Sequence, residues 1–125
     1  MKIGIDLHGV SDAFPTFFAE MTRLFKEAGH EVIIITGPSV NEKTIKEIEA
    51  CGLSYTSILS IVDYHIDKGT PCSYDADGNF WVDDEPWNKT KAELCREHGI
   101  DFHIDDSPHY GKYFSTPYMQ VNIKK

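Results

Sequence analysis

The chain contains no long hydrophobic run. A helix needs about 18 consecutive apolar residues to cross a membrane, and none of the apolar runs in these 125 residues approaches that length. The first residues, Met1 to Asp6, enter a strand-like pattern directly, without the basic and apolar regions of a signal peptide. We therefore expect a cytoplasmic protein with no membrane partner.

Basic residues are also scarce. Lysine and arginine together number 12 against 20 aspartates and glutamates, which gives a formal net charge of −8, and no basic cluster stands out. This balance argues against binding an extended nucleic acid through its phosphate backbone. It leaves open a small anion that binds together with a metal ion.

Cysteine is the third scarcity. The three cysteines, Cys51, Cys72 and Cys95, are widely spaced and form no Cys-x-x-Cys pair, so neither a disulfide framework nor a zinc finger is indicated. The hydrophobic fraction of 41% is ordinary for a globular protein. A chain of this length can bury one core, and we expect residues 1–125 to form a single domain.

What the sequence does contain is an alternation of strand-like and helical patterns. Apolar runs at 2–6 and 31–36 flank a segment, 14–28, whose apolar residues recur at helical spacing before Gly29. This order predicts a βαβ unit and hence a parallel sheet. A second unit is expected to follow, with a helix over 40–51 capped by Ser39 and a third strand over 55–61.

The rest of the chain predicts further elements, which are a hairpin within 72–82, a helix over 86–98, a strand at 102–105 and an edge strand at 118–123. The expected fold class is therefore α/β. It is a three-layer α/β/α Rossmann-like domain with a mainly parallel sheet, a small β-hairpin insertion and no large cap.

Polar residues close three of the apolar runs. Asp6 follows Ile3-Gly4-Ile5, Thr36 follows Ile33-Ile34-Ile35, and Asp105-Asp106 follows Phe102-His103-Ile104. The carboxyl ends of parallel strands share one edge of the sheet, where open α/β proteins bind ligands. Carboxylates that converge there indicate a hard cation and phosphoryl chemistry, and magnesium suits such oxygen ligands.

These motifs together resemble the haloacid dehalogenase-like (HAD) superfamily. The segment Ile5-Asp6-Leu7-His8-Gly9-Val10 is similar to the first HAD motif, except that His8 replaces the second aspartate. Thr36, a lysine and Asp105-Asp106 correspond to the other three motifs. The resemblance covers nearly the whole chain and includes the small deoxyribonucleotidase branch of the superfamily.

The resemblance implies a magnesium-dependent phosphatase without a large cap. Asp6 would be the nucleophile that forms an aspartyl-phosphate, and its carboxylate would also contact Mg²⁺. The backbone carbonyl of His8 and the side chain of Asp106 would be metal ligands, and Asp105 would support the metal site from behind these direct ligands. The substrate would be a small phosphorylated molecule, with a nucleotide as the first expectation.

The phosphoryl group would be held by Thr36, the backbone amide of Gly37 and a lysine. Lys91 and Lys89 both precede the last acidic motif on the predicted helix. We favour Lys91, because its place on that helix better suits a return to the strand at 102–105.

His8 leaves the function open. A histidine exchanges protons near neutral pH and could replace the aspartate as general acid and base. It could equally mark a catalytically impaired domain that binds phosphate or metal without turnover. A third interpretation is a phosphotransferase that passes the phosphoryl group from Asp6 to another acceptor.

Two other patterns allow a functional and a structural interpretation. Asp63-x-His65-x-Asp67 has spacing that could ligate a second metal, but isolated histidines are more often structural. The aromatic residues Phe80, Trp81 and Trp87 could form a wall that faces the substrate, or a small cluster packed on the sheet edge.

Overall fold

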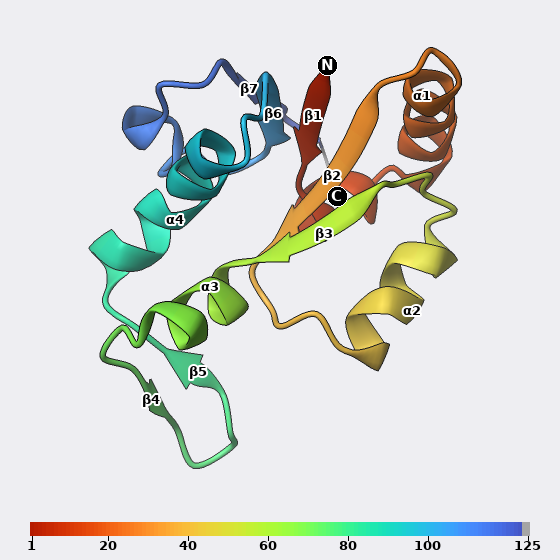
Figure 1. Cartoon of the computed structure of the whole chain (residues 1–125). Coiled ribbons are helices and arrows are strands. Elements are labelled where there is room, and N and C mark those ends of the chain that lie inside the picture. Colours follow the sequence, from red (N-terminus) through yellow and green to blue (C-terminus); the bar gives the residue numbers. More distant parts are fainter. Residues whose placement is uncertain (124–125) are drawn as a thin grey trace.

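The computed structural model of the chain describes residues 1–123. Five parallel strands form the main sheet in the order β3-β2-β1-β6-β7. Figure 1 shows helices on both sides of this sheet, so the α/β class and the three layers predicted from the sequence are confirmed. The strands of this sheet are β1 (Lys2–Ile5), β2 (Glu31–Thr36), β3 (Ser57–Ser60), β6 (Phe102–Asp105) and β7 (Tyr118–Gln120).

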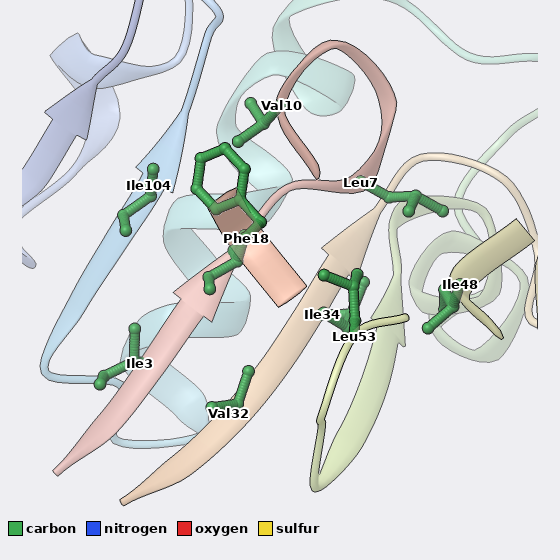
Figure 2. Close-up of a cluster of buried hydrophobic side chains, with 10 residues drawn as sticks. Ile3, Leu7, Val10, Phe18, Val32, Ile34, Ile48, Leu53 and Ile104 are labelled. Atoms are coloured by element: carbon green, nitrogen blue, oxygen red, sulfur yellow. The ribbon is translucent and has the colours of Figure 1, made fainter. Parts of the chain in front are cut away.

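Alternation along the strands explains the layers, because successive side chains of a strand point to opposite faces. On β2, Val32 and Ile34 face the helices α1 (Pro15–Glu27) and α2 (Glu42–Ala50), which contribute Phe18 and Ile48 to the same buried cluster (Figure 2). The other face of β2 packs against α4 (Asp84–Glu97) through Leu94 and Cys95, with α3 (Ile61–Lys68) beside it. Both faces of the sheet are therefore covered.

The strand order places a topological switch between β1 and β6. The chain builds outward from β1 through β2 to β3, then crosses to the opposite side of β1 and continues through β6 to β7. The connections therefore diverge at the carboxyl ends of β1 and β6, which opens a crevice there. Asp6 and Asp105 lie at that point, as the residue after β1 and the last residue of β6.

The third predicted strand proved shorter, and a helix follows it directly. β3 ends at Ser60, whose side chain accepts a hydrogen bond of 3.1 Å from the backbone N–H of Asp63 and so caps α3. The sequence prediction missed α3 because the apolar, β-branched run continues from Ile58 through Val62. Gly69, in the left-handed conformation with φ 69°, ends the helix.

The predicted cap of the second helix was also wrong. α2 begins at Glu42, and Asn41 caps it by accepting a 3.0 Å hydrogen bond from the backbone N–H of Thr44. Ser39 contributes its backbone carbonyl instead, to the Thr44 hydroxyl at 2.7 Å. The helix therefore starts two residues after the predicted first residue, Val40.

The predicted hairpin is confirmed, with strands β4 (Ser73–Tyr74) and β5 (Phe80–Trp81) that pair antiparallel in a small sheet of their own. It projects beyond the carboxyl ends of β2 and β3 in Figure 1. The last strand, β7, is shorter than the predicted 118–123. No helix within residues 1–123 is long and apolar enough to span a membrane.

Candidate functional site

The loop after β1 fixes the position of Asp6. Gly9 has φ 88°, a conformation that side chains rarely adopt, and its backbone N–H donates to Asp12 at 2.7 Å. The Ser11 hydroxyl donates to the backbone carbonyl of Asp6 at 2.8 Å. These contacts turn the chain sharply at the sheet edge, and the backbone N–H of Asp6 still donates to Ile104 at 2.9 Å.

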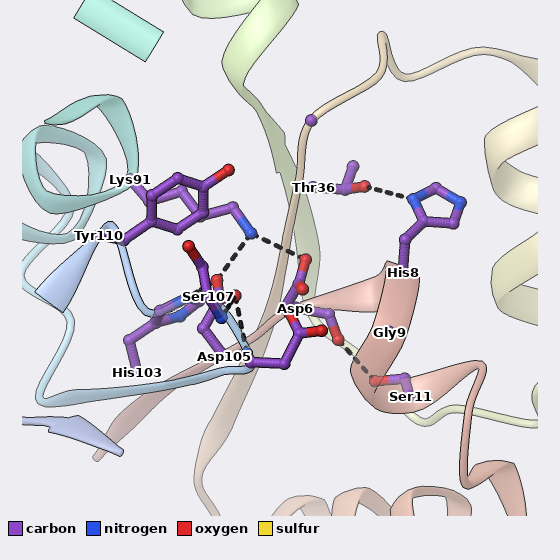
Figure 3. A network of polar contacts seen from close by, with 12 residues as sticks. Asp6, His8, Gly9, Ser11, Thr36, Lys91, His103, Asp105, Ser107 and Tyr110 are labelled. Atoms are coloured by element: carbon purple, nitrogen blue, oxygen red, sulfur yellow. Dashed lines mark hydrogen bonds and ion pairs between the residues drawn. The ribbon is translucent and has the colours of Figure 1, made fainter. Parts of the chain in front are cut away.

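A buried lysine joins the ends of β1 and β6. Nζ of Lys91, from α4, donates to Oδ1 of Asp6 at 2.7 Å and to Oδ2 of Asp105 at 2.8 Å (Figure 3). Only 3% of the lysine is exposed. Burial by itself would lower the pKa of Lys91, but the charges of both carboxylates outweigh it and raise the pKa, so the ammonium stays protonated.

Asp105 is the anchored carboxylate of the pair. Its Oδ1 accepts from the backbone N–H groups of Asp106 and Ser107, and its Oδ2 accepts from Lys91 and from Nε2 of His103 at 2.8 Å. Burial would raise the pKa of Asp105, but the His103 hydrogen bond and the charge of Lys91 overcome it and hold the pKa below its ordinary value. Asp105 is therefore an ionised anchor with both oxygens in use.

Asp6 is held differently. One oxygen accepts from Lys91, and no hydrogen bond from the described residues reaches the other, Oδ2. Burial, opposed by Lys91 and reinforced by the nearby Asp105 charge, raises the pKa of Asp6 to about 7. This carboxyl group thus gains or loses its proton near neutral pH, and a cation at Oδ2 would stabilise its ionised form.

His103 is a part of this network that the sequence analysis did not assign to it. The imidazole is fully buried, stacks on Phe114 at 5.5 Å between ring centroids, and leaves Nδ1 without a hydrogen-bond partner in the described chain. A β-carbon at Gly4 would lie 2.7 Å from that Nδ1, so glycine leaves room for the ring. The period of a strand, which puts residues two apart on one face, could have linked His103 to Asp105.

His8 and Thr36 lie apart from the carboxylates. Nε2 of His8 lies 2.6 Å from Oε2 of Glu47, a residue of α2, and Nδ1 lies 3.5 Å from the Thr36 hydroxyl. Thr36 itself is fully buried. Figure 3 shows the His8 ring beside Thr36 and away from Asp105. The predicted roles of the Thr36 hydroxyl and of the His8 backbone carbonyl stay predictions.

A cavity of about 230 Å³ opens over the carboxylates. The predicted site residues that line it are Asp6, His8, Gly37, Lys91, Asp105 and Asp106. Lys89 does not line it; its side chain is 42% exposed and lies 4.0 Å from Glu93 on α4. Sequence reasoning missed three further lining residues, Pro38, Ser107 and Tyr110. Nζ of Lys91 lies over the ring of Tyr110, 5.4 Å from the ring centroid.

The donor set fits a hard divalent cation. Asp6, Asp105 and Asp106 each offer a carboxylate oxygen, and these oxygens lie within 4.8 Å of one another. Magnesium prefers oxygen ligands and usually takes one or two carboxylates together with water. Because Asp105 already uses both oxygens, Asp6 and Asp106 are the carboxylates that fit as direct ligands, with Asp105 behind them.

The second metal pattern does not form a site. His65 is buried on α3, with Nε2 2.7 Å from the Thr90 hydroxyl and Nδ1 2.9 Å from the Thr70 hydroxyl. Because the Thr90 hydroxyl donates to the carbonyl of Pro86, it accepts from Nε2–H, and Nδ1 accepts from Thr70. Both ring nitrogens are thus in use, and the histidine is structural.

Comparisons with known proteins give a similar fold but no family. No protein-family model matches the chain, and no curated protein matches it. The crystal structure of a universal stress protein in complex with cAMP is similar, with a TM-score of 0.50 and 10% sequence identity. The alignment covers 99% of this chain and 98% of that chain. At this identity the likeness establishes the α/β fold alone.

This likeness overturns the family predicted from the sequence. Universal stress proteins belong to a Rossmann-like family different from HAD, so the assignment to HAD was wrong. The predictions that depended on it, a hydrolase of the HAD type and a magnesium-dependent phosphatase acting through an aspartyl-phosphate on Asp6, are withdrawn. The physical reason is that any parallel sheet gathers strand-end polar residues at one edge, so short motifs there do not identify a family.

Proposed function

We propose that the edge formed by β1 and β6 binds Mg²⁺ together with the phosphate group of a small ligand. The observation that carries this proposal is the convergence of Asp6, Asp105 and Asp106 within 4.8 Å. A cation at Oδ2 of Asp6 would offset the repulsion between that carboxylate and a phosphate, which is doubly charged. The role is binding, and no chemical step is assigned.

The phosphate would find donors beside the cation. Gly37, the residue after β2, and Lys91 both line the cavity, so the Gly37 backbone N–H and the Lys91 ammonium would be the donors. The site would thus combine a cation, a buried ammonium and a main-chain donor in about 230 Å³. A universal stress protein of similar fold binds cAMP, which is a small phosphorylated ligand.

Cation binding is tested by calorimetry with Mg²⁺ and by electron paramagnetic resonance with Mn²⁺. We expect Asp6→Asn and Asp106→Asn each to weaken cation binding by at least about ten-fold. Asp67→Asn, which changes an exposed aspartate on α3, is the matched control and should bind as the wild type does. Equal affinity in all four proteins would place the cation elsewhere.

Phosphate binding is tested in the same samples. Inorganic phosphate should bind in the presence of Mg²⁺ and lose most of its affinity when a chelator removes the cation. A phosphate affinity that does not change when the chelator is added would contradict a site shared by the cation and the phosphate. Steady release of phosphate from an added phosphomonoester would contradict a role limited to binding.

A further inference from the structure

The acidic cavity adjoins a larger one. His8 and Pro38 line both cavities, and the second has a volume of about 680 Å³. Small-molecule sites usually span about 300–1,000 Å³, so the second cavity can take the organic part of a ligand. The smaller cavity has room for a phosphate group and its cation. A ligand held by its phosphate would therefore extend past His8 into the larger cavity.

Aromatic side chains from two elements line the larger cavity. Tyr74 and Phe80 are cross-strand partners on the hairpin, with ring centroids 5.7 Å apart, and Trp87 comes from the first turns of α4. Tyr74 is 60% exposed, so this group is not a closed packing cluster. The hairpin thus presents an accessible aromatic surface to the cavity.

Trp87 connects the aromatic surface to the acidic cavity. A β-carbon at Gly37 would lie 3.1 Å from the indole, so the ring rests directly on the backbone that follows β2. Its Nε1–H donates to the hydroxyl of Tyr110 at 3.1 Å, and Tyr110 lines the acidic cavity. These contacts hold the indole in place without a ligand, so binding does not have to order it.

The two faces of the hairpin differ. Side chains alternate along a strand, and Tyr74 and Phe80 line the large cavity, whereas Ser73 and Trp81 line a separate hollow on the opposite side. Trp81 is 59% exposed, and its Nε1–H donates to Asp75 within the hairpin turn. The chain therefore supplies an adjacent aromatic residue that does not face the cavity.

We infer that the phosphorylated ligand carries a planar aromatic ring, as a nucleotide does, and that this ring stacks on the surface formed by Tyr74, Phe80 and Trp87. The inference rests on the proposed function, because the phosphate anchor directs the ring into this cavity. Stacking of a base on an aromatic side chain is sequence-tolerant, since every base has a π-face. The hairpin would then select ligands by their ring, while the acidic edge holds their phosphate.

The test compares adenosine 5′-monophosphate with ribose 5-phosphate, which has the same phosphate and sugar but no ring. With Mg²⁺ present, calorimetry should give the nucleotide an affinity about ten-fold higher or more. Phe80→Ala should remove most of that difference and leave ribose 5-phosphate unchanged. Trp81→Ala is the matched control and should retain the full preference. Phe80→Leu, which keeps an apolar side chain, should lose the preference in a folded hairpin.

Fluorescence supplies an independent measurement. The chain has two tryptophans, so Trp81→Phe leaves Trp87 as the single indole reporter. Its emission should change on addition of adenosine 5′-monophosphate and stay constant with ribose 5-phosphate. Equal affinities for the two ligands, or an equal loss in Phe80→Ala and Trp81→Ala, would overturn the inference and leave the phosphate site intact.

Failure of the phosphate site is distinguished by adenosine, which has the ring and no phosphate. If no phosphorylated probe binds with Mg²⁺, the proposed function fails, and a nuclear magnetic resonance titration with millimolar adenosine decides the ring site by itself. Shifts of hairpin and Trp87 resonances that vanish in Phe80→Ala support it. The absence of such shifts overturns it.

Discussion

The ends of β1 and β6 lie side by side and share Lys91, yet they hold their carboxylates in opposite ways. Asp105 accepts four hydrogen bonds, two of them from backbone N–H groups, and its pKa is lowered. Asp6 accepts one from Lys91, and burial raises its pKa to about 7. The difference shows that the number of donors, more than burial, decides which carboxylate supports the site and which is available to a ligand.

The largest effect is expected when the Lys91 ammonium, to which both carboxylates are hydrogen-bonded, is removed. Lys91→Met leaves Asp6 and Asp105 buried without their common partner, and we expect a loss of about 3–5 kcal/mol in the free energy of unfolding. Chemical denaturation at neutral pH measures it. Lys89→Met is the matched control on the same helix; its contact with Glu93 is long and partly exposed, so its effect should stay within about 0.5 kcal/mol. Similar losses in both variants would mean that Lys91 is not the structural centre.

Replacing each carboxylate in turn distinguishes Asp105, which supports the site, from Asp6, which is available to a ligand. Asp105→Asn removes the charge that holds His103 and Lys91, and should cost about 2–4 kcal/mol in the metal-free protein. Asp6→Asn should leave the protein at least as stable as the wild type at pH 8, because Lys91 keeps Asp105 and the buried, ionised Asp6 carboxylate is unfavourable above its pKa of about 7. Thermal and chemical unfolding at pH 8 compare the two. Equal losses would contradict the proposed division of roles.

The raised pKa of Asp6 also predicts that the stability of the protein depends on pH. Its folded-state pKa of about 7 lies above the ordinary 3.8, so the folded state binds the proton more tightly than the unfolded chain does. The stability that Asp6 contributes is complete below about pH 4 and is lost as the pH rises through about 7. His65 and His103, whose pKa values are lowered by burial, act in the opposite direction below about pH 6.5.

The difference in stability between wild type and Asp6→Asn isolates this effect. Without metal, the free energy of unfolding of the wild type should fall relative to that of Asp6→Asn as the pH rises from 5 to 9. Mg²⁺ should reduce this change at the alkaline end. Cation affinity should rise over the same interval, because the ion competes with the Asp6 proton. A difference that is flat with pH would show that Asp6 is ionised throughout.

Much of the fold could be predicted because its local and long-range patterns agree. The apolar runs that became β1, β2 and β6 end in polar residues or turns, and parallel strands necessarily bring those ends together. The start of α3 was not predicted because apolar residues lie on both sides of Ser60. Nothing in the residue types from Ile58 to Val62 indicates where the strand stops. The cap Asn41 was missed for a similar reason, since Ser39 is an equally good cap by residue type.

The sequence predicted the carboxylates and the lysine that the structure brings together, but not His103, Tyr110 or the way in which each carboxylate is held. The sequence placed Asp6, Asp105 and Lys91 at one sheet edge, but which carboxylate is saturated depends on the turn after β6 and on the His103 rotamer. The same limit explains the wrong family. Strand-end aspartates and a lysine satisfy a set of short motifs, whereas a family is defined by the whole chain, and 10% identity to a universal stress protein shows how widely this fold tolerates sequence change.

The smallest expected effect concerns the ion pair at the margin of the site. Oε2 of Glu47 lies 2.6 Å from Nε2 of His8, with both side chains over a third exposed, so solvent screens the pair. Glu47→Gln should change the free energy of unfolding by less than about 1 kcal/mol, far less than Lys91→Met. Because His8 lines both cavities, the same variant should alter ligand affinity more than stability, as calorimetry with adenosine 5′-monophosphate would measure. Glu42→Gln, on the exposed first turn of α2, should change neither. A large loss of stability in Glu47→Gln would mean that contacts at the margin, as well as the buried ones, hold this edge together.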